Sequence, residues 1–361
     1  MSLSILIKPA SSLCQMRCEY CFYADVSHHR AVASYGMMTE AVRDLLLARV
    51  KETGVKDVFF AFQGGEPTLT GLDFFKGFVA AAKKELPTCR IGYSLQTNGL
   101  ALDDAFCRFL AENSFLVGLS LDGDEALHDL YRKDGSGLGT HARVLAAAER
   151  LRRFGVEFNI LTVVTETLAD RVEEIWQYYQ RQGFGFVQFI PCLPSLTPSA
   201  KEKAYLTPRG YGRFLKTLFP LWQKDALAGR YISVRLFDNV VQQAFGNQPE
   251  QCGQCGRCAP QYVVEADGSV YPCDFYVLDE YRVGNLATHK LSEIFRDGVM
   301  QGFLTYRMPS ECKGCPWLNF CRGNCKRYRG FYRSEGDYCP YRDFLSACRE
   351  GILAVGEKAF S

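Results

Sequence analysis

The stretch Cys14-Gln-Met-Arg-Cys18-Glu-Tyr-Cys21-Phe22-Tyr23 decides how the rest of this chain is interpreted. Three cysteines separated by three and then two residues can converge on one face of a tight loop. Their thiolates can hold three irons of a cubane iron–sulfur cluster and leave the fourth iron without a protein ligand. An open metal position can bind a second molecule, whereas structural metal sites are closed. Half of a zinc site is the alternative, because paired cysteines in an intracellular chain are commonly zinc ligands.

The composition is that of a globular protein with a substantial core. The chain has 361 residues, of which 47% are hydrophobic and 23% charged, enough for one barrel-sized domain and a smaller one. Lys and Arg (42) nearly balance Asp and Glu (40), so the net charge of +2 gives no reason to expect nucleic acid or an anionic membrane as partner. No apolar run approaches a membrane span, and the first residues lack the basic region of a signal peptide. We therefore expect a cytoplasmic protein.

Sixteen cysteines are far more than a globular chain of this length usually contains. They fall into two groups, and no signal peptide points to an oxidising compartment. Reduced thiols that act as metal ligands are therefore the favoured interpretation over disulfides.

The first two thirds of the chain alternate short apolar strands with amphipathic helices. Six parallel strands with right-handed crossovers would form an open, partial (β/α)6 barrel over residues 1–234. The helices are expected at Thr39–Lys51, Thr140–Phe154, Leu168–Gln182 and from Thr207 onward, each with a capping residue or a terminal glycine. The expected strands are Ser4–Lys8, Asp57–Phe62, Arg90–Gln96, Phe115–Leu121, Glu157–Val164 and Phe186–Ile190.

The unusual loops all follow strands, which would bring them to one rim of the barrel. In such folds the chemistry lies on the loops at the carboxyl ends of the strands. Taken singly, Gly-Gly, Asn-Gly and Asp-Gly are ordinary turn formers, so their position carries the argument. The loops are the cysteine stretch, Gly64-Gly65-Glu66-Pro67, Gln96-Thr97-Asn98-Gly99, Ser120-Leu121-Asp122-Gly123 and Pro191-Cys192-Leu193-Pro194.

Residues 235–361 are richer in glycine, cysteine and turn residues, and we place a domain boundary at their start. A β-hairpin is expected at Val263–Glu265 and Ser269–Tyr271, around Ala266-Asp267-Gly268, where it would present Cys273. The cysteines run Cys252, Cys255, Cys258, Cys273, then Cys312-x2-Cys315-x5-Cys321-x3-Cys325, and finally Cys339. A pair of zinc ribbons is the alternative, because zinc and iron–sulfur sites share ligands and spacing.

Both cysteine frames resemble those of known enzymes. The first, with an aromatic residue after its third cysteine, is similar to the radical S-adenosylmethionine (SAM) superfamily. The second meets every spacing of the SPASM domain, which such enzymes carry when they act on peptides and proteins. The match narrows to the anaerobic sulfatase-maturating enzymes through Ile7–Ser12, Ser34-Tyr35-Gly36, Phe60–Pro67, Ser94–Gly99 and Tyr271-Pro272-Cys273-Asp274-Phe275-Tyr276.

This resemblance implies three [4Fe–4S] clusters and bound SAM. Cys14, Cys18 and Cys21 would hold the SAM-binding cluster. Eight further cysteines would fill two closed cubanes with interleaved ligands. The nearer would use Cys252, Cys258, Cys273 and Cys325, and the farther Cys312, Cys315, Cys321 and Cys339. Cys255 lies between two of these ligands and could in principle replace either, whereas Cys89 and Cys107 are expected to be core thiols.

The same resemblance assigns residues to SAM. Gly64, Gly65 and Glu66 would receive the SAM amine, because glycines let the backbone approach a ligand closely. Ser120 and Arg132 would bind its carboxylate, since a guanidinium can pair with a carboxylate through two hydrogen bonds. A solvated surface charge is the alternative for Arg132. Phe22 and Leu193 would be further SAM contacts.

The activity implied is oxidation of a cysteine or serine in a sulfatase polypeptide to Cα-formylglycine, within a Cys/Ser-x-Pro/Ala-x-Arg motif. A radical would remove hydrogen from the target Cβ, and a base must then take a proton from the thiol or hydroxyl. By resemblance the base is Asp274, with Tyr23 and Gln63 orienting the target. Asp274 could instead be only a turn residue near the cluster. A flavodoxin- or ferredoxin-type reductant and a monomeric enzyme are also expected.

Two other functions are compatible with the same two cysteine patterns. A SPASM peptide maturase would form thioether or carbon–carbon crosslinks, although no N-terminal recognition module is expected before Ser4. An iron–sulfur electron carrier is the second, but a carrier needs no open iron. The sequence leaves open whether cysteine or serine is the preferred target, which sulfatase is served, and what the reductant is.

Overall fold

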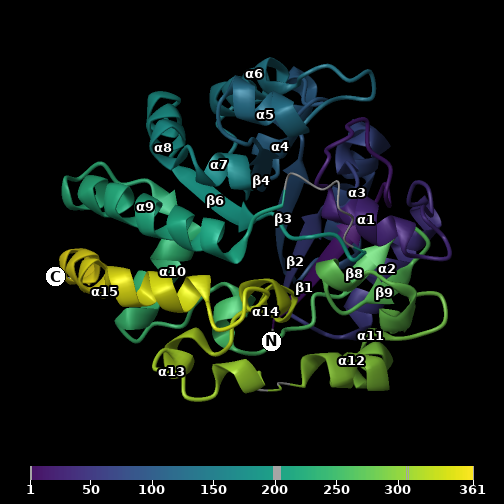
Figure 1. Cartoon of the computed structure of the whole chain (residues 1–361). Helices are drawn as coiled ribbons and strands as arrows, with labels where there is room; N and C mark the ends of the chain where they lie inside the picture. The colour runs from purple at the N-terminus through teal and green to yellow at the C-terminus, as the bar shows by residue number, and fades with distance from the viewer. Residues whose placement is uncertain (1, 198–204, 306, 308, 361) are drawn as a thin grey trace. The chain divides into compact units, whose positions relative to one another are not determined.

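The computed structural model describes residues 2–197, 205–305, 307 and 309–360, and Figure 1 shows the chain. The chain packs into two compact units, each built from separate stretches of sequence. The first comprises Met1–Ser120, Arg132–Phe158 and Pro260–Leu304, and the second Leu121–Tyr131, Asn159–Ala259 and Thr305–Ser361. The domain boundary between residues 234 and 235 stays a prediction.

A mostly parallel sheet forms the centre of the first unit. Strands β1 (Ser2–Lys8), β2 (Asp57–Phe62), β3 (Arg90–Thr97) and β4 (Phe115–Ser120) pair in this order, all parallel. Phe60, Phe62, Phe78, Tyr93 and Phe115 are buried on these strands and on a covering helix. The Phe62 and Phe78 rings lie 4.9 Å apart edge to face, and Tyr93 stacks on Phe115 at 4.9 Å. Aromatic packing thus fixes the strands that carry the loops of the expected rim.

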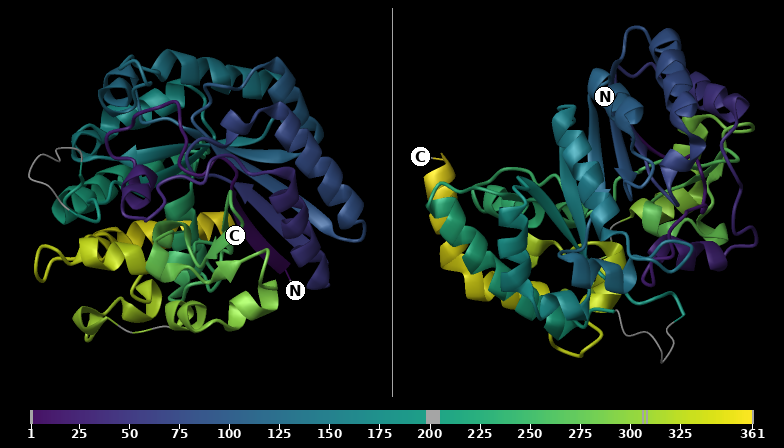
Figure 2. Two further views of the ribbon diagram at one scale, coloured as in Figure 1. Left: turned by 90° about the vertical axis from the view of Figure 1, so that its right-hand side faces the viewer. Right: turned by 90° about the horizontal axis from the view of Figure 1, so that it is seen from above.

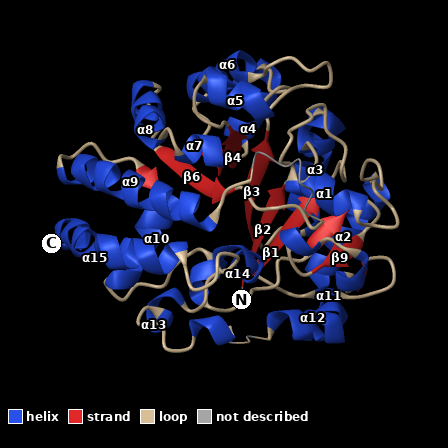
Figure 3. Cartoon of the chain, in the orientation of Figure 1, coloured by secondary structure: helices blue, strands red, loops and turns tan. Residues whose placement is uncertain are grey.

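Helices follow the strands along the chain, and Figure 3 draws the helices in blue and the strands in red. The helix α2 begins where predicted, because the Thr39 hydroxyl accepts a hydrogen bond from Val42 N at 3.3 Å. The helices and 3-10 turns that follow the first four strands are α1 (Phe22–His28), α2 (Glu40–Glu52), η1 (Pro67–Thr70), α3 (Leu72–Glu85), α4 (Asp104–Glu112) and α6 (His141–Arg153).

The predicted hairpin is present, but its place in the sheet was not predicted. Strands β8 (Val263–Glu265) and β9 (Ser269–Tyr271) are antiparallel, with Gly268 at φ +82° in the turn. β8 also pairs in parallel with β1, so that Lys8 stands opposite Glu265. The hairpin therefore extends the sheet of the first unit. The remaining elements of this unit are η3 (Asp274–Tyr276), η4 (Asp279–Tyr281), β10 (Gly284–Asn285), α11 (Leu291–Arg296) and α12 (Gly298–Leu304), with β10 antiparallel to β9.

In the described part of the second unit, three parallel strands accompany a core of long helices. β5 (Phe158–Val164), β6 (Phe186–Pro191) and β7 (Ser233–Val234) pair in this order. α9 (Pro208–Leu227) lies beside α15 (Pro340–Phe360), as both views of Figure 2 show. Phe219 of α9 and Phe344 of α15 meet at 5.6 Å. The other elements are α5 (Glu125–Tyr131), α7 (Glu166–Ala169), α8 (Val172–Arg181), α10 (Arg235–Ala244), η2 (Cys252–Cys255), η5 (Ser310–Cys312), α13 (Leu318–Cys321) and α14 (Lys326–Tyr332).

The α/β class and the six expected strands are confirmed, each strand within two residues of its predicted ends. Among the described strands, β10 pairs only with β9 and β7 only with β6, so no complete ring of strands closes. One helix was predicted wrongly. Leu168–Gln182 is not a single helix, because Arg171 leaves helical geometry (φ −121°, ψ 30°) and pairs with Asp124 and Glu174 at 2.7 and 2.5 Å. The separate helices α7 and α8 result.

Within the described residues, no helix is both long and apolar enough to cross a bilayer.

Candidate active site

The cysteine loop runs from the end of β1 to the start of α1. Cys21 precedes the first residue of α1, and its backbone N–H donates to the Cys18 carbonyl at 3.2 Å. Met16 N donates to the Cys14 sulfur at 3.3 Å. The pKa of Cys14 is raised to about 11, chiefly by burial and also by the nearby negative charges of Glu66 and Cys21. The loop therefore brings Cys14 and Cys21 within electrostatic reach of one another, in a setting where a thiolate requires a positive partner.

The Gly64-Gly65 turn holds the cysteine loop in place. Gly65 has φ +29°, and a Cβ built there would lie 2.8 Å from the Ser11 carbonyl oxygen and closer still to that of Leu13. Glu66 N donates to the same Leu13 carbonyl at 2.7 Å. Gly65 thus permits a close approach of the backbone that leads into the cysteines, whereas Gly64 lies against the Lys8 side chain. Contact of either glycine with SAM stays a prediction.

The Glu66 carboxylate ties two neighbouring loops together. Its side chain is 1% exposed, and one oxygen accepts from Thr68 N, Thr68 Oγ1 and Thr97 Oγ1 at 3.1, 2.6 and 2.7 Å. The other oxygen accepts from Asn98 N at 2.8 Å. Burial raises the pKa of Glu66, and these hydrogen bonds oppose the rise. Protein donors thus already use both oxygens, and contact of Glu66 with the SAM amine stays a prediction.

Two polar side chains lie against the cysteine sulfurs. Asn98 Nδ2 donates to the Cys14 sulfur at 3.7 Å, and Arg132 Nη1 lies 3.9 Å from the Cys18 sulfur. Arg132 is 8% exposed, with its guanidinium 5.5 Å from the centre of the Tyr20 ring, so it is not the solvated charge that we held as the alternative. N–H groups directed at thiolate sulfurs are typical of the surroundings of iron–sulfur clusters. The loop residues fit such a cluster.

The other residues expected at the SAM site occupy the loops from which they were inferred. Phe22 begins α1, is 37% exposed, and packs 5.2 Å from the Phe275 ring. Ser120 ends β4 in the first unit, and Leu193 follows β6 in the second; both are half-buried. Their contacts with SAM stay predictions.

Asp274 and Gln63, far apart in sequence, are brought together. Gln63 follows β2 and donates its side-chain amide to Oδ2 of Asp274, which is the first residue of η3. Lys8 Nζ lies 2.5 Å from Oδ1 of the same carboxylate. Asp274 N donates to the side chain of Gln261 at 2.9 Å. Since the Asp274 side chain is only 13% exposed, its position is defined by protein contacts on both oxygens.

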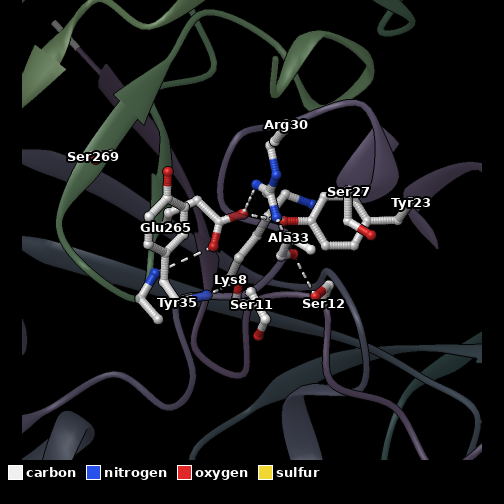
Figure 4. A network of polar contacts seen from close by, with 12 residues as sticks. Lys8, Ser11, Ser12, Tyr23, Ser27, Arg30, Ala33, Tyr35, Glu265 and Ser269 are labelled. Atoms are coloured by element: carbon white, nitrogen blue, oxygen red, sulfur yellow. Dashed lines mark hydrogen bonds and ion pairs between the residues drawn. The ribbon is translucent and has the colours of Figure 1, made fainter. Parts of the chain in front are cut away.

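Tyr23 meets Arg30 and Glu265 in a buried network, as Figure 4 shows. It is 3% exposed, and its hydroxyl donates to Glu265. Burial, then the negative charge of Glu265, raises the pKa of Tyr23 well above its usual value, so the hydroxyl keeps its proton. Arg30 Nη1 binds the same Glu265 oxygen at 2.6 Å. Direct binding of the target by Tyr23 stays a prediction, and its observed contacts are internal.

Sequence reasoning missed Lys8, Arg30 and Glu265. Lys8 and Glu265 are both 0% exposed, and Arg30 is 6% exposed. A signal was available, because Lys8 and Glu265 each end an apolar strand, and charged residues are almost never fully buried unless they are paired. The opposite charges of Lys8 in β1 and Glu265 in β8 could therefore have indicated that these two strands pair.

The thiols of the second unit lie in two neighbourhoods, and the ligand sets named from the sequence stay a prediction. The Cys312 and Cys321 thiols lie within electrostatic reach of Cys339 and Cys315, and the pKa of both is raised, first by burial and then by these neighbours. Burial raises the pKa of Cys252 to about 11, with smaller contributions from Cys325, Cys258 and Cys255.

Cys255 belongs to the same neighbourhood as Cys252, and its thiol donates to the Pro249 carbonyl at 3.3 Å. Cys273 lies in the first unit, two residues after the end of β9. Cys107, Cys192 and Cys348 are buried thiols, and Cys89 donates to the Val55 carbonyl at 3.0 Å.

No group of three or more His, Cys, Asp or Glu side chains converges tightly enough to hold one metal ion, in the part of the chain that the structure describes. A cubane places each thiolate on a different iron, so its ligands stand farther apart than those of zinc. None of the sixteen cysteines, all of them described, forms a disulfide.

Comparison with known proteins agrees with this geometry. Residues 9–198 match the radical SAM superfamily and residues 255–316 match an iron–sulfur cluster-binding domain, SPASM. The cysteine-type anaerobic sulfatase-maturating enzyme of Clostridium perfringens (strain ATCC 13124) is 44% identical, covering 98% of both chains. That of Clostridium novyi is 42% identical over 90% of this chain and 88% of its own. This chain belongs to the anaerobic sulfatase-maturating enzymes.

Further comparisons find a serine-type relative and similar solved structures. The serine-type anaerobic sulfatase-maturating enzyme of Bacteroides thetaiotaomicron is 28% identical, covering 95% of this chain and 91% of its own. The solved structure of native anSMEcpe with bound AdoMet and the Cp18Cys peptide has a TM-score of 0.92 at 40% identity, covering 99% of this chain and 100% of that one. Streptococcus suis SuiB bound to its precursor peptide SuiA has a TM-score of 0.64 at 18% identity, covering 91% and 72%, which shows a shared fold alone.

Proposed function

We propose that this maturase oxidises a cysteine of a sulfatase polypeptide to Cα-formylglycine, within a Cys-x-Pro/Ala-x-Arg motif. The observation that carries the proposal is similarity over nearly the whole chain to cysteine-type enzymes, at 42–44% identity. Serine-type relatives are only 28–31% identical. We therefore favour cysteine over serine as the target.

Oxidation of the target removes two hydrogens from its side chain. Bound SAM with the cluster would supply a 5′-deoxyadenosyl radical, which takes one hydrogen atom from the target Cβ. The thiol then loses its proton, and one further electron must leave to give the thioaldehyde. Hydrolysis of the thioaldehyde yields the aldehyde and hydrogen sulfide. The protein must therefore provide a base beside the sulfur.

Asp274 is our proposed base. It is a part-exposed carboxylate whose oxygens are oriented by Lys8 and Gln63, and each oxygen keeps a further lone pair for the thiol proton. Gln63 is proposed to orient the target from the same place, because its side-chain amide stands next to that carboxylate. The roles proposed for Gly64, Gly65, Glu66, Ser120, Arg132, Phe22 and Leu193 are contacts with SAM.

The cofactor set that we propose is three [4Fe–4S] clusters with the ligands named from the sequence. The proximity of the Cys312, Cys315, Cys321 and Cys339 thiols, and of the Cys252, Cys258 and Cys325 thiols, supports two auxiliary sites. We further propose a flavodoxin- or ferredoxin-type reductant, a monomeric state and a cytoplasmic location.

The test is mass spectrometry of matched sulfatase-derived peptides after anaerobic incubation with SAM and a reductant. We expect the cysteine peptide to lose sulfur and gain an aldehyde that reacts with a hydrazide, faster than the serine peptide. A crosslinked product that keeps its sulfur would contradict this activity, and preference for serine would contradict the choice of target.

A further inference from the structure

Lys8 is a fully buried charge in contact with Asp274. Its side chain is 0% exposed, and Nζ stands 2.5 Å from Asp274 Oδ1 and 3.7 Å from the centre of the Tyr23 ring. The aliphatic part of the Lys8 side chain packs closely against the backbone of Gly64. A Cβ at Gly64 would lie only 2.6 Å from Lys8 Cγ. An ammonium group buried in this way requires a nearby negative charge, and the Asp274 carboxylate supplies it.

A second buried ion pair supports the aromatic ring under Lys8. The Tyr23 hydroxyl donates to Glu265, which also binds Arg30, and both charged side chains of this pair are 0% exposed. Arg30 Nη2 donates in turn to the Ala33 carbonyl at 2.8 Å. Figure 4 shows Lys8, Tyr23, Arg30 and Glu265 meeting in one network. The parallel pairing of β1 with β8 produces this meeting, since it places Lys8 opposite Glu265.

We propose that Lys8 is a positioning residue for the reaction, holding one oxygen of Asp274 fixed while Tyr23, anchored by Glu265, holds Lys8. This inference rests on the proposed function. With Lys8 on Oδ1 and Gln63 on Oδ2, the carboxylate plane has one orientation toward the target. Tyr23 then acts through Lys8, because the face of its ring contacts the Lys8 ammonium group. Its hydroxyl donates a hydrogen bond to Glu265, which holds the ring in place. A base held in one geometry is a more effective proton acceptor than one that rotates.

The main variant is Lys8→Met, which keeps the length of the stem and removes the charge. We expect formylglycine per 5′-deoxyadenosine to fall by roughly tenfold or more, through kcat, with KM for the peptide within about threefold of wild type. The matched control is Lys51→Met, which removes an exposed ion pair with Glu85 and should keep the wild-type ratio.

A double-mutant cycle tests whether Lys8 acts by positioning Asp274 or only by balancing its buried charge. If Lys8 acts through Asp274, then Lys8→Met with Asp274→Asn should be no less active than Asp274→Asn alone. The double variant also removes both buried charges, so its iron content and thermal midpoint should match those of wild type. Additive losses in the cycle would overturn the inference.

Tyr23 provides a second route in case Lys8→Met fails to fold. Tyr23→Leu removes the ring face and leaves Lys8 charged, whereas Tyr23→Phe keeps the face. We expect the product ratio to fall more in Tyr23→Leu than in Tyr23→Phe, at unchanged iron content. A wild-type ratio in folded Lys8→Met or in Tyr23→Leu overturns the role of Lys8, while failure of the wild-type enzyme itself to form formylglycine would instead overturn the proposed function.

Discussion

At the scale of single residues, the proposed chemistry depends on how the carboxylate of Asp274 is held. One oxygen meets Lys8 and the other Gln63, and both partners come from the ends of neighbouring strands. The carboxylate is thus oriented, while its side chain remains 13% exposed. A base needs both properties, because it must meet the substrate proton in a defined geometry.

Asp274→Asn tests this role, because it keeps size and hydrogen bonding but removes the proton acceptor. We expect the variant to keep its iron, bind SAM and release some 5′-deoxyadenosine with a peptide substrate, since removal of hydrogen comes before loss of the proton. Formylglycine should fall by roughly 10²–10⁴-fold. Transfer of deuterium from the target Cβ to 5′-deoxyadenosine should persist. Full product formation would exclude Asp274 as base, and loss of iron would make it structural.

Cys255 lies near a proposed cluster ligand but has a hydrogen-bond partner of its own. Its thiol lies near that of Cys252 but donates to the Pro249 carbonyl, which gives it a partner inside the protein. We expect Cys255→Ala to keep the full iron content and Cys252→Ala to lose about four irons, the content of one cubane. Iron analysis and the visible spectrum after anaerobic reconstitution measure both. The reverse result would exchange the two residues in the ligand set.

At the scale of elements, the loops of the site are held by one another. The turn after β2 touches the cysteine loop at Gly65, and Glu66 binds the loop after β3 through Asn98. A change in one loop should therefore reach the cysteines without any contact with a cofactor.

Gly65→Ala tests that coupling between loops. A Cβ at this position would press on the Leu13 and Ser11 carbonyls, from a φ of +29° that disfavours alanine. We expect a cost of about 1–3 kcal/mol, concentrated in the cysteine loop. SAM cleavage should fall while the iron of the auxiliary clusters remains. Gly185→Ala is the control, because its Cβ would meet nothing within 4 Å and its φ is ordinary. Equal behaviour of the two variants would contradict the coupling.

The pairing of β8 with β1 places a second buried ion pair, Arg30 with Glu265, beside the site. Glu265→Gln should leave the Arg30 charge without its partner, at a cost of about 3–5 kcal/mol. Anaerobic thermal unfolding should show a lower midpoint. Adding Arg30→Met should restore much of the loss, since an apolar pair avoids the buried charge. If the single variant unfolds at the wild-type midpoint, the pair contributes little to stability.

The sequence was enough to predict much of this architecture. Thr39 and Thr207 cap helices where expected, and the apolar runs of β1–β6 became strands, because local capping and alternation of elements determine these features. The pairing of β8 with β1 could not be read from local pattern, since it joins segments about 255 residues apart. The Lys8 and Glu265 contacts depend on that pairing and were missed with it. The break at Arg171 was also missed; there the backbone leaves helical geometry and the side chain pairs with Asp124, which is 47 residues away in sequence.

At the scale of the whole molecule, the cysteines divide according to their surroundings. Cys107, Cys192 and Cys348 are buried among core residues, whereas all the proposed ligands are at least partly exposed. Apolar burial favours the neutral thiol, and a cluster ligand must be a thiolate. Burial therefore separates Cys107, Cys192 and Cys348 from the eleven proposed ligands, whereas Cys89 and Cys255 are half-buried like most of those ligands.

The number of clusters follows from that division and can be counted. Three cysteines in the loop after β1 and eight in the second frame correspond to three cubanes, so we expect about twelve irons per reconstituted chain. Replacing Cys14, Cys18 and Cys21 together with alanine should remove about four of these irons and abolish SAM cleavage. The auxiliary clusters should remain, because none of their proposed ligands lies in that loop.

The core variant Cys107→Ala should keep all the iron, at a cost in stability alone. A wild-type chain with about four irons in total, or with stoichiometric zinc, would show that the second frame holds zinc or no metal at all, because zinc tolerates the same ligands and similar spacing.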